Sequence, residues 1–343
     1  MRVLVTGGAG FIGSHYVRHV LSTSADHVTV LDALTYAGSL DSLAPVLPSN
    51  RMTFVEGNIL DESLVNDLVR THDVVVHFAA ESHVDRSFLA GTHFLKVNVL
   101  GTQRLLDAAR RHGVAKFVHV STDEVYGPLV ASAASEDAPL RPTVPYAASK
   151  AASDLVALSA YATHQVPVCV TRSSNNYGPH QYPEKVIPRF VTGLLKGERV
   201  GLHGRGEHVR NWVHVRDNVI GIDLVLRKGT PGEVYNLGGG TDLTNKQLTE
   251  RILDACGADW DRVDYIPDRP SNDVRYAMTW DKAKRLGYTP KHDFDAGLAE
   301  TVAWYRAHPD RWTPLHRAAD PPDSNVTPTP ADAVLPLSYE SYS

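Results

Sequence analysis

Short apolar runs alternate with segments of helical length through the first half of the chain, and this alternation limits the fold more than any other feature. Six valine-rich runs have the length of single strands: 2–7, 27–32, 52–57, 73–79, 116–122 and 166–172. Helix-length segments with polar starts, such as 61–70, separate most of them. Strands that are apolar on both faces belong to a parallel sheet covered by helices on both sides. The sequence therefore predicts an α/β fold with a doubly wound parallel sheet.

A glycine-rich stretch, VTGGAGFIGSH, follows the first predicted strand and opens a predicted helix. Gly7, Gly10 and Gly13 would give a tight turn, a close backbone approach to a pyrophosphate and free N–H groups at the start of the helix. Glycine spacing alone also fits a flexible turn, but its place at the first strand–helix junction favours a dinucleotide site. Asp32 ends the second strand, where a carboxylate accepts hydrogen bonds from the adenosine ribose and repels a 2′-phosphate. We therefore predict NAD rather than NADP.

Tyr146 and Lys150 are spaced i and i+4 within a predicted helix over 146–163. A nearby ammonium favours the tyrosinate, so we expect Lys150 to lower the pKa of Tyr146 and to make it a base near neutrality. A single Tyr-x-x-x-Lys is often only a surface pair. Its place after an NAD half-sheet, and after the strand end at Ser121, favours a catalytic pair.

Composition excludes several classes of function. The 343 residues carry a formal net charge of −5, which gives no electrostatic reason to expect nucleic acid or an anionic membrane as a partner. Apolar runs are too short to cross a bilayer, and no signal peptide is expected before the first strand. Cys169 and Cys256 are the two cysteines, without metal-ligand spacing. These features predict a reduced cytoplasmic protein without a metal site.

The motifs together resemble the nucleotide-sugar branch of the extended short-chain dehydrogenase/reductase family, over residues 1 to about 312. The resemblance is carried by Gly7, Gly10, Gly13 and Asp32, by HFAAESHVDRS (77–87), by STDEVYG (121–127), and by Tyr146 and Lys150. It implies a Rossmann domain over 1–175, to which later segments return, and a smaller, interleaved nucleotide-sugar-binding α/β domain over 176–312. The proline-rich remainder, 313–343, is predicted to be extended or disordered.

The residues after Ser121 separate the chemistries of this branch. The 4-epimerases have small, non-acidic residues there, whereas decarboxylases and GDP-mannose 4,6-dehydratases have a T-S-E pattern. Thr122, Asp123 and Glu124 instead look like the dTDP-glucose 4,6-dehydratases, which form dTDP-4-keto-6-deoxyglucose and water and recycle NAD. Dehydration of another sugar such as UDP-glucose, a decarboxylase or epimerase activity, and a non-catalytic NAD-binding sensor remain alternatives.

This resemblance implies a role for each catalytic residue. Tyr146 and NAD would oxidise the sugar at C4, which acidifies the C5 hydrogen. Glu124 would remove that proton as the base, and Asp123 would protonate the departing C6 hydroxyl. Two neighbouring carboxyls in a desolvated pocket have pKa values that are pushed apart, as these roles require. Thr122 would hydrogen-bond the C4 oxygen.

Further binding residues follow from the resemblance alone. For NAD they are Phe11, Ile12, Leu34, Thr35, Gly38, Asn58, Ile59, Phe78, Ala79, Ala80, Ser82, Val97 and Ser121, together with Tyr146 and Lys150. For the nucleotide sugar they are His83, Thr122, Asn175, Glu184, Lys185, Val186, His203, Arg210, Asn245, Arg269 and Asn272. Arg210 and Arg269 would clamp the diphosphate, since a planar guanidinium suits bidentate contact.

Several positions depart from the pattern of the family. Asn58 replaces an aspartate near adenine, His203 replaces a stacking tyrosine, and Asn272 replaces a histidine near the diphosphate. These changes bear on affinity and base selectivity before they bear on the reaction. Helical segments at 93–113 and 146–163 form a dimer interface in relatives, so a homodimer is expected by resemblance. The altered substrate loops would fit a deoxysugar pathway.

Overall fold

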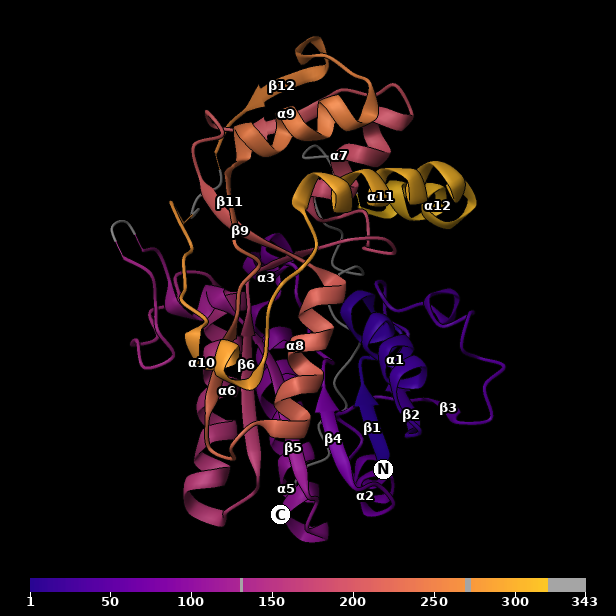
Figure 1. Ribbon diagram of the computed structural model, residues 1–343, viewed down its shortest axis with the longest axis vertical. Helices are drawn as coiled ribbons and strands as arrows, with labels where there is room; N and C mark the ends of the chain where they lie inside the picture. The colour runs from indigo at the N-terminus through magenta and orange to yellow at the C-terminus, as the bar shows by residue number, and fades with distance from the viewer. Residues whose placement is uncertain (130–131, 269–272, 320–343) are drawn as a thin grey trace, which may run out of the picture.

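A seven-stranded parallel sheet forms the larger part of the molecule (Figure 1). The computed structural model describes residues 1–129, 132–268 and 273–319. The strands are β1 (Arg2–Thr6), β2 (His27–Asp32), β3 (Met52–Glu56), β4 (Val74–His77), β5 (Lys116–Thr122), β6 (Val168–Ser173) and β10 (Val234–Leu237), in the order β10-β6-β5-β4-β1-β2-β3. The predicted doubly wound parallel sheet is confirmed, and the six predicted strands all form.

Helices cover both faces of this sheet because its central strands are buried on both sides. One face packs against α1 (Phe11–Thr23), α8 (Val215–Lys228) and α10 (Asp281–Leu286). The other packs against α2 (Glu62–Arg70), α5 (Thr102–His112) and α6 (Pro145–His164). Two apolar cores result, one on each side of the sheet.

The helix predicted over 93–113 is interrupted. It consists of α4 (Gly91–Leu95), a π-helical turn η2 (Lys96–Gly101) and α5, which ends at Gly113 with φ 64°. Inside the π turn, the Asn98 side chain accepts the Glu81 N–H and donates to Ser149 Oγ on α6. The Asn98 side chain in this π turn therefore links α6 to the backbone at Glu81. The apolar periodicity of the sequence does not reveal this polar contact.

A smaller unit lies over the carboxyl edge of the sheet, at the top of Figure 1. It contains a three-stranded sheet of β7 (Asn175–Tyr177), β9 (Val209–His214) and β11 (Thr241–Thr244), and a two-stranded sheet of β8 (Val200–His203) and β12 (Val263–Ile266). Helices α7 (Val186–Leu195), α9 (Asn245–Cys256), α11 (Phe294–Ala307) and α12 (Pro309–Ala319) share its core. Short helices η1 (Leu40–Ser42), α3 (Val84–Leu89), η3 (Asp123–Tyr126) and η4 (Trp260–Arg262) complete the described elements. The chain crosses between the two units more than once, since α8, β10 and α10 rejoin the large sheet.

The structure differs from the sequence analysis at the start of the proline-rich tail. Residues 313–319 continue helix α12, although an extended segment was expected from 313. The helix is held by Trp312, which is buried and whose Nε1–H donates to the Tyr305 carbonyl at 2.7 Å. Such long-range packing outweighs a local composition that is poor in helix formers. Residues 320–343 lie outside the described part of the chain.

Candidate active site

A cavity of about 490 Å³ lies between the carboxyl edge of the large sheet and the smaller unit. The order of the strands reverses between β1 and β4, and the cavity opens at this point. Crevices at such switch points of doubly wound sheets are where ligands bind. Its walls come from both units, from the glycine turn before α1 to Tyr276.

The cavity collects residues that the sequence analysis singled out from distant segments. Every described residue that was predicted for catalysis, cofactor binding or substrate binding lines it, with the exception of Leu34. Leu34 has a left-handed backbone (φ 47°), and its N–H donates to Asp32 Oδ1 at 2.9 Å. It therefore orients the carboxylate instead of facing the cavity. Arg269 and Asn272 lie outside the described residues.

The glycine turn fits a dinucleotide diphosphate. A Cβ on Gly7 would lie 2.5 Å from the Ala79 nitrogen, and a Cβ on Gly13 would lie 2.2 Å from the Gly7 oxygen, so only glycine allows the turn to pack this closely. Gly10 is the N-cap of α1 and has no side-chain cap, which leaves the first N–H groups of the helix for a ligand. Such N–H groups, at the positive end of the helix dipole, favour phosphate.

Asp32 is placed for the ribose side of the same ligand. It is buried, and its two carboxylate oxygens accept N–H groups from Ala9 and Leu34. Burial raises the pKa of this carboxyl, and the two N–H groups oppose the rise. Its remaining lone pairs face the cavity that it lines. Asn58 also lines the cavity; its Oδ1 accepts the Leu60 N–H at 2.9 Å and retains a second lone pair.

The acidic pair lies where β5 passes into η3. Thr122 caps this turn, with its hydroxyl accepting the Glu124 N–H at 3.3 Å. Asp123 is only 3% exposed, and burial, followed by the charge of Glu124, raises its pKa to about 8. Its Oδ2 has no hydrogen-bond partner within the described chain. Asp123 is thus a neutral acid at pH 7 with a free oxygen at the cavity wall.

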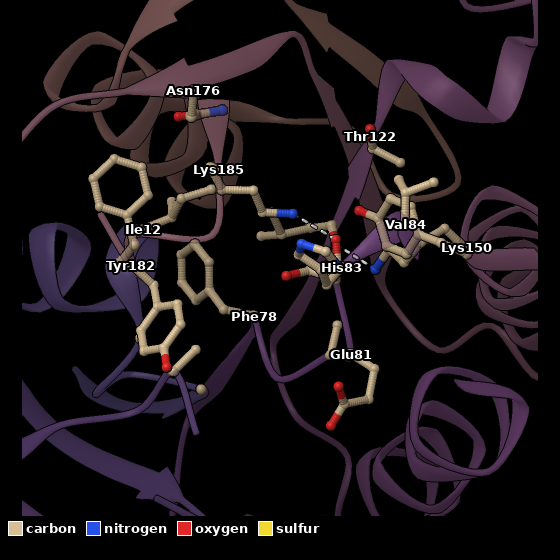
Figure 2. A pocket seen from close by; sticks show the side chains of 18 of the residues that line it. Ile12, Phe78, Glu81, His83, Val84, Thr122, Lys150, Asn176, Tyr182 and Lys185 are labelled. Atoms are coloured by element: carbon tan, nitrogen blue, oxygen red, sulfur yellow. Dashed lines mark hydrogen bonds between the residues drawn. The ribbon is translucent and has the colours of Figure 1, made fainter. Parts of the chain in front are cut away.

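Tyr146 and Lys150 come from the first turns of α6 and line the same cavity, and Tyr146 interacts with Thr122, Asp123 and Glu124. Figure 2 labels Lys150 and Thr122 on the same side of the cavity. The expected lowering of the Tyr146 pKa is wrong for this state of the protein. Burial, Glu124 and Asp123 together raise the pKa of Tyr146 above its ordinary value, and a hydrogen bond with Thr122 only partly opposes them. The Lys150 ammonium donates to the Val120 carbonyl at 2.8 Å, and burial lowers its pKa to about 8.

Arg210 on β9 also lines the cavity, and its charge acts on Asp123; it carries the cationic group expected for a diphosphate. Its guanidinium stacks on the Tyr276 ring at 4.3 Å, and Nη1 donates to the Val209 carbonyl. Tyr276 in turn donates to Asp273 Oδ2 at 2.7 Å, and Thr143 also donates to that carboxylate. The arginine is therefore held in a fixed direction by residues from three segments.

Residues 182–185, the substrate-side segment before α7, are bound to the cofactor side. Lys185 Nζ donates to the Ser82 carbonyl at 2.7 Å, and Figure 2 shows it reaching across the cavity. Glu184 accepts a hydrogen bond from Tyr36 and lies 3.6 Å from Arg86 Nε, whose guanidinium stacks on the Tyr36 ring. Both side chains were expected to bind substrate, and their present partners belong to the protein.

Several lining residues were missed by the sequence analysis: Glu81, Val84, His93, Ser173, Ser174, Asn176, Gln181, Tyr182, Trp212, Asp273 and Tyr276. Asn176, Gln181 and Tyr182 follow β6 in the same stretch as Asn175 and Glu184, so their place at a strand's carboxyl end was a usable signal. Tyr276 and Asp273 come from a loop far along the chain. Their proximity depends on how the smaller unit packs.

Within residues 1–129, 132–268 and 273–319, no helix has the length and the apolar character that a membrane span requires. No group of three or more His, Cys, Asp or Glu side chains in them could hold a metal ion.

The fold and the cavity indicate a class of protein, and similarity to known protein families identifies that class. Residues 4–301 match the family model described as GDP-mannose 4,6 dehydratase. The chain belongs to this family, whose Rossmann-type sheet of the extended short-chain dehydrogenase/reductase kind it shares. It is thus an enzyme of the NAD-dependent hydro-lyase type.

The individual relatives are more specific. The chain is 55% identical to a dTDP-glucose 4,6-dehydratase of Streptomyces antibioticus, covering 92% of this chain and 96% of that one. It is 50% identical to one of Streptomyces niveus, covering 97% and 99%. The crystal structure of DesIV, a dTDP-glucose 4,6-dehydratase of Streptomyces venezuelae with NAD and dTDP bound, superposes with a TM-score of 0.91 at 52% identity, covering 92% of this chain and 100% of that one. The resemblance stated from the sequence motifs is confirmed.

Proposed function

We propose that the protein converts dTDP-glucose into dTDP-4-keto-6-deoxyglucose and water. The observation that carries this proposal is the buried Asp123 beside Glu124, facing Tyr146 across a cavity that fits NAD. The names of the relatives support the same substrate. An epimerase has no need of this acid–base pair.

In this reaction Tyr146, as the tyrosinate, would take the proton of the C4 hydroxyl, and Thr122 would hold the C4 oxygen. This role requires that the positive charges of bound NAD and Lys150 offset the burial and the carboxylates that raise the pKa of Tyr146 in the protein alone. The glycine turn and Asp32 would hold NAD, which would supply the hydride acceptor for C4 and the hydride donor for C6. Glu124 removes the C5 proton, and Asp123 protonates the C6 hydroxyl, which leaves as water. Glu124 then returns its proton to C5. Over one turnover Tyr146 gains one proton and Asp123 loses one, so the protons balance. The sugar loses water and undergoes no net oxidation.

The raised pKa of Asp123 suits its role. An acid must be protonated at the pH at which its partner base is ionised. Asp123, with a pKa of about 8, meets the first condition at neutral pH. Its own burial and the neighbouring charge of Glu124, which is partly exposed, explain the rise.

The test uses purified protein with dTDP-glucose, UDP-glucose and UDP-glucuronate, with the products identified by mass. We expect loss of water from dTDP-glucose, without net NAD reduction. Faster dehydration of UDP-glucose would assign a different base selectivity. Loss of carbon dioxide from UDP-glucuronate would assign a decarboxylase, and absence of any product would favour a sensor.

We infer further that the protein acts as a cytoplasmic homodimer in deoxysugar biosynthesis. Four leucines are exposed on α3, α4, η2 and α6, which are packed against one another. These are Leu89, Leu95, Leu100 and Leu155, exposed by 87%, 51%, 44% and 60%. Contiguous exposed apolar side chains of this kind mark protein interfaces. Cys169 and Cys256 are free thiols, which suits a reducing compartment.

A further inference from the structure

Behind the cavity wall, three charged or titratable side chains are buried together between α6 and the large sheet. Asp154 on α6 and His119 on β5 are fully buried, and Arg172 on β6 is 2% exposed. Arg172 Nε donates to Asp154 Oδ2 at 2.9 Å, and His119 Nε2 lies 3.4 Å from Asp154 Oδ1. None of the three lines the cavity. Burying an ion pair costs more free energy than it returns in many proteins, so this cluster calls for a role other than stability.

The position of Asp154 suggests that role. Tyr146, Lys150 and Asp154 are spaced four residues apart, so they lie in one row along α6. Lys150 is 4% exposed, and its ammonium donates to one backbone carbonyl, that of Val120. A buried ammonium loses its proton unless an anion or further acceptors compensate for the lost water. Asp154 is one turn further along the same face.

We propose that Asp154 is a positioning residue for the dehydration. Its carboxylate, fixed by Arg172 and His119, keeps the Lys150 ammonium charged beneath Tyr146. The inference rests on the proposed function, because it gives the lysine of that site its charge.

The charged and titratable groups near Lys150 come from several packed elements. Asp154 on α6, His119 on β5 and His77 on β4 interact electrostatically with Lys150. Arg172 on β6 is paired with Asp154, and Asp123 and Glu124 on η3 act on Tyr146. Burial lowers the pKa values of His77 and His119, so both rings are neutral at pH 7. Asp123 is protonated there as well.

The carboxyl of Asp154 is ionised at pH 7. Burial alone would raise its pKa, but hydrogen bonding from His119 and the charge of Arg172 hold the pKa below its ordinary value. For Lys150, burial lowers the pKa to about 8, and the negative charge of Asp154 opposes that fall. Without Asp154 the pKa of Lys150 would be lower still, so a larger fraction of this side chain would be neutral at pH 7.

The direct test measures the ionisation of Lys150 without relying on turnover. The full-length protein is treated with acetic anhydride from pH 6 to pH 10, and the acetylation rate of Lys150, which lines the cavity, is followed by peptide mass spectrometry. The proposal expects the midpoint in Asp154→Asn to fall by at least about one pH unit, a tenfold change in the ionisation constant. Asp154→Glu, which keeps the charge, should return it toward the wild-type value.

A second variant guards against a folding defect. Asp154→Asn leaves Arg172 as an unpaired buried charge, whereas Asp154→Asn/Arg172→Met removes the whole pair and so relieves that penalty. The double variant should fold with a Tm near that of the wild type and still show the lowered midpoint. An unshifted Lys150 midpoint in the folded double variant would overturn the proposal.

The kinetic readout separates positioning from binding. Because Asp154 does not line the cavity, Asp154→Asn should lower kcat for dTDP-glucose at least about threefold at pH 7.5, as the charged fraction of Lys150 falls, with KM changed less than about twofold. A raised KM at unchanged kcat would contradict the inference. If the wild-type protein fails to dehydrate dTDP-glucose, the proposed function fails, and the acetylation midpoints still decide the role of Asp154.

Discussion

At the residue scale, the two adjacent carboxyls of η3 differ in burial, and this difference assigns their chemistry. Asp123 is enclosed and Glu124 is partly exposed, so the first holds a proton at neutral pH. Substituting either one should leave the glycine turn and Asp32 unchanged, since these lie at the other end of the cavity.

We therefore expect Asp123→Asn and Glu124→Gln each to lower turnover at least about 100-fold while NAD remains bound. Turnover is measured with dTDP-glucose, and bound NAD is measured after release from the denatured protein. Asp107→Asn, which removes a carboxylate from α5 outside the cavity, serves as the matched control and should keep full activity. A wild-type rate in either η3 variant would contradict the assigned roles.

The pH dependence follows from the same two side chains. The pKa of Asp123 is raised to about 8, so its carboxyl can donate a proton below this pH and loses the ability above it. Lys150 loses its proton over the same range, so the decline in kcat above about pH 8 belongs to both groups. In Glu124→Gln the repulsion that raises the Asp123 pKa is absent, and the residual activity should decline at lower pH. If kcat of this variant declined at the same pH as kcat of the wild-type protein, Lys150 alone would cause the decline.

The chemistry of these residues was accessible from sequence to different degrees. The order of Thr122, Asp123 and Glu124 after a buried strand, with Tyr146 and Lys150 one helix later, was enough to predict which residues meet. The direction of the Tyr146 pKa was predicted wrongly, because it depends on burial and on both carboxylates. Neither effect can be read from an i, i+4 spacing.

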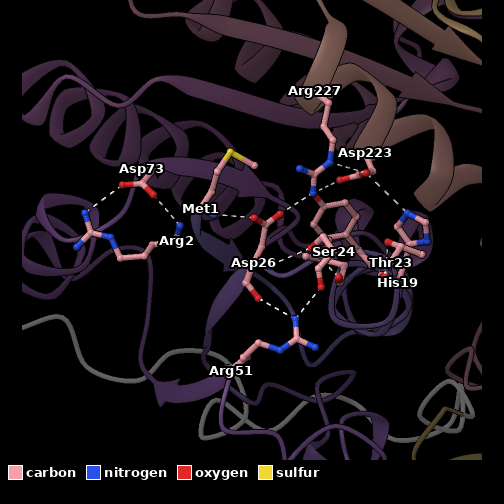
Figure 3. Close-up of polar contacts among 12 residues, drawn as sticks. Met1, Arg2, His19, Thr23, Ser24, Asp26, Arg51, Asp73, Asp223 and Arg227 are labelled. Atoms are coloured by element: carbon pink, nitrogen blue, oxygen red, sulfur yellow. Dashed lines mark hydrogen bonds and ion pairs between the residues drawn. The ribbon is translucent and has the colours of Figure 1, made fainter.

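At the element scale, α8 is joined to the start of β2 by a cluster of charged groups (Figure 3). Arg227 on α8 donates to Asp26 Oδ2 at 2.6 Å and to Asp223 Oδ2 at 2.9 Å. The α-amino group of Met1 donates to the other oxygen of Asp26. Burial would raise the pKa of Asp26, but these hydrogen bonds hold it to about 2.

Arg227→Ala should therefore lower the free energy of unfolding by about 1–2 kcal/mol at pH 7, since the pair is only partly exposed and two carboxylates lose their shared cation. The pKa of Asp26 is depressed on folding, so its contribution is present above about pH 4 and is lost as the pH falls toward 2. Urea denaturation at pH 7 and at about pH 2 measures both effects. Arg2→Ala breaks the exposed pair with Asp73 and should cost less than about 0.5 kcal/mol. Equal losses in the two variants would contradict this account.

The elements themselves were predictable where local pattern and final packing agree. The valine-rich strands are buried on both faces, so their composition identifies them. The π turn inside 93–113 and the helix at 309–319 were missed. Both depend on partners distant in the chain: Ser149 for the π turn, and for α12 the core that encloses Trp312.

At the scale of the whole molecule, the exposed leucines of α3, α4, η2 and α6 should form the contact between two copies. Leu155→Glu places a charge on this surface, at a leucine exposed by 60%, and should shift the protein from dimer to monomer in light scattering. Leu47→Glu, at a leucine exposed by 42% in the loop after η1, is the matched control and should leave the mass unchanged. A monomeric wild-type protein would refute the dimer directly.

The arrangement of the two units could be predicted only in part. The loss of the strand–helix alternation beyond about residue 180 indicated a second unit over the carboxyl edge. The contacts between units, such as Lys185 with Ser82, join residues whose separation in sequence gives no signal. They arise from the packing of the smaller unit around its own core.

Residues 182–185 have a consequence for how the enzyme depends on its surroundings. This segment connects the smaller unit to the cofactor side of the cavity through two sets of contacts. Lys185 contacts Ser82, and Glu184 contacts Tyr36 and Arg86. In the proposed reaction a dinucleotide in this crevice would serve as hydride acceptor and then as hydride donor within one turnover, so no external NAD or NADH would be consumed. We therefore expect the rate of product formation to be independent of the ratio of NAD to NADH in the cell.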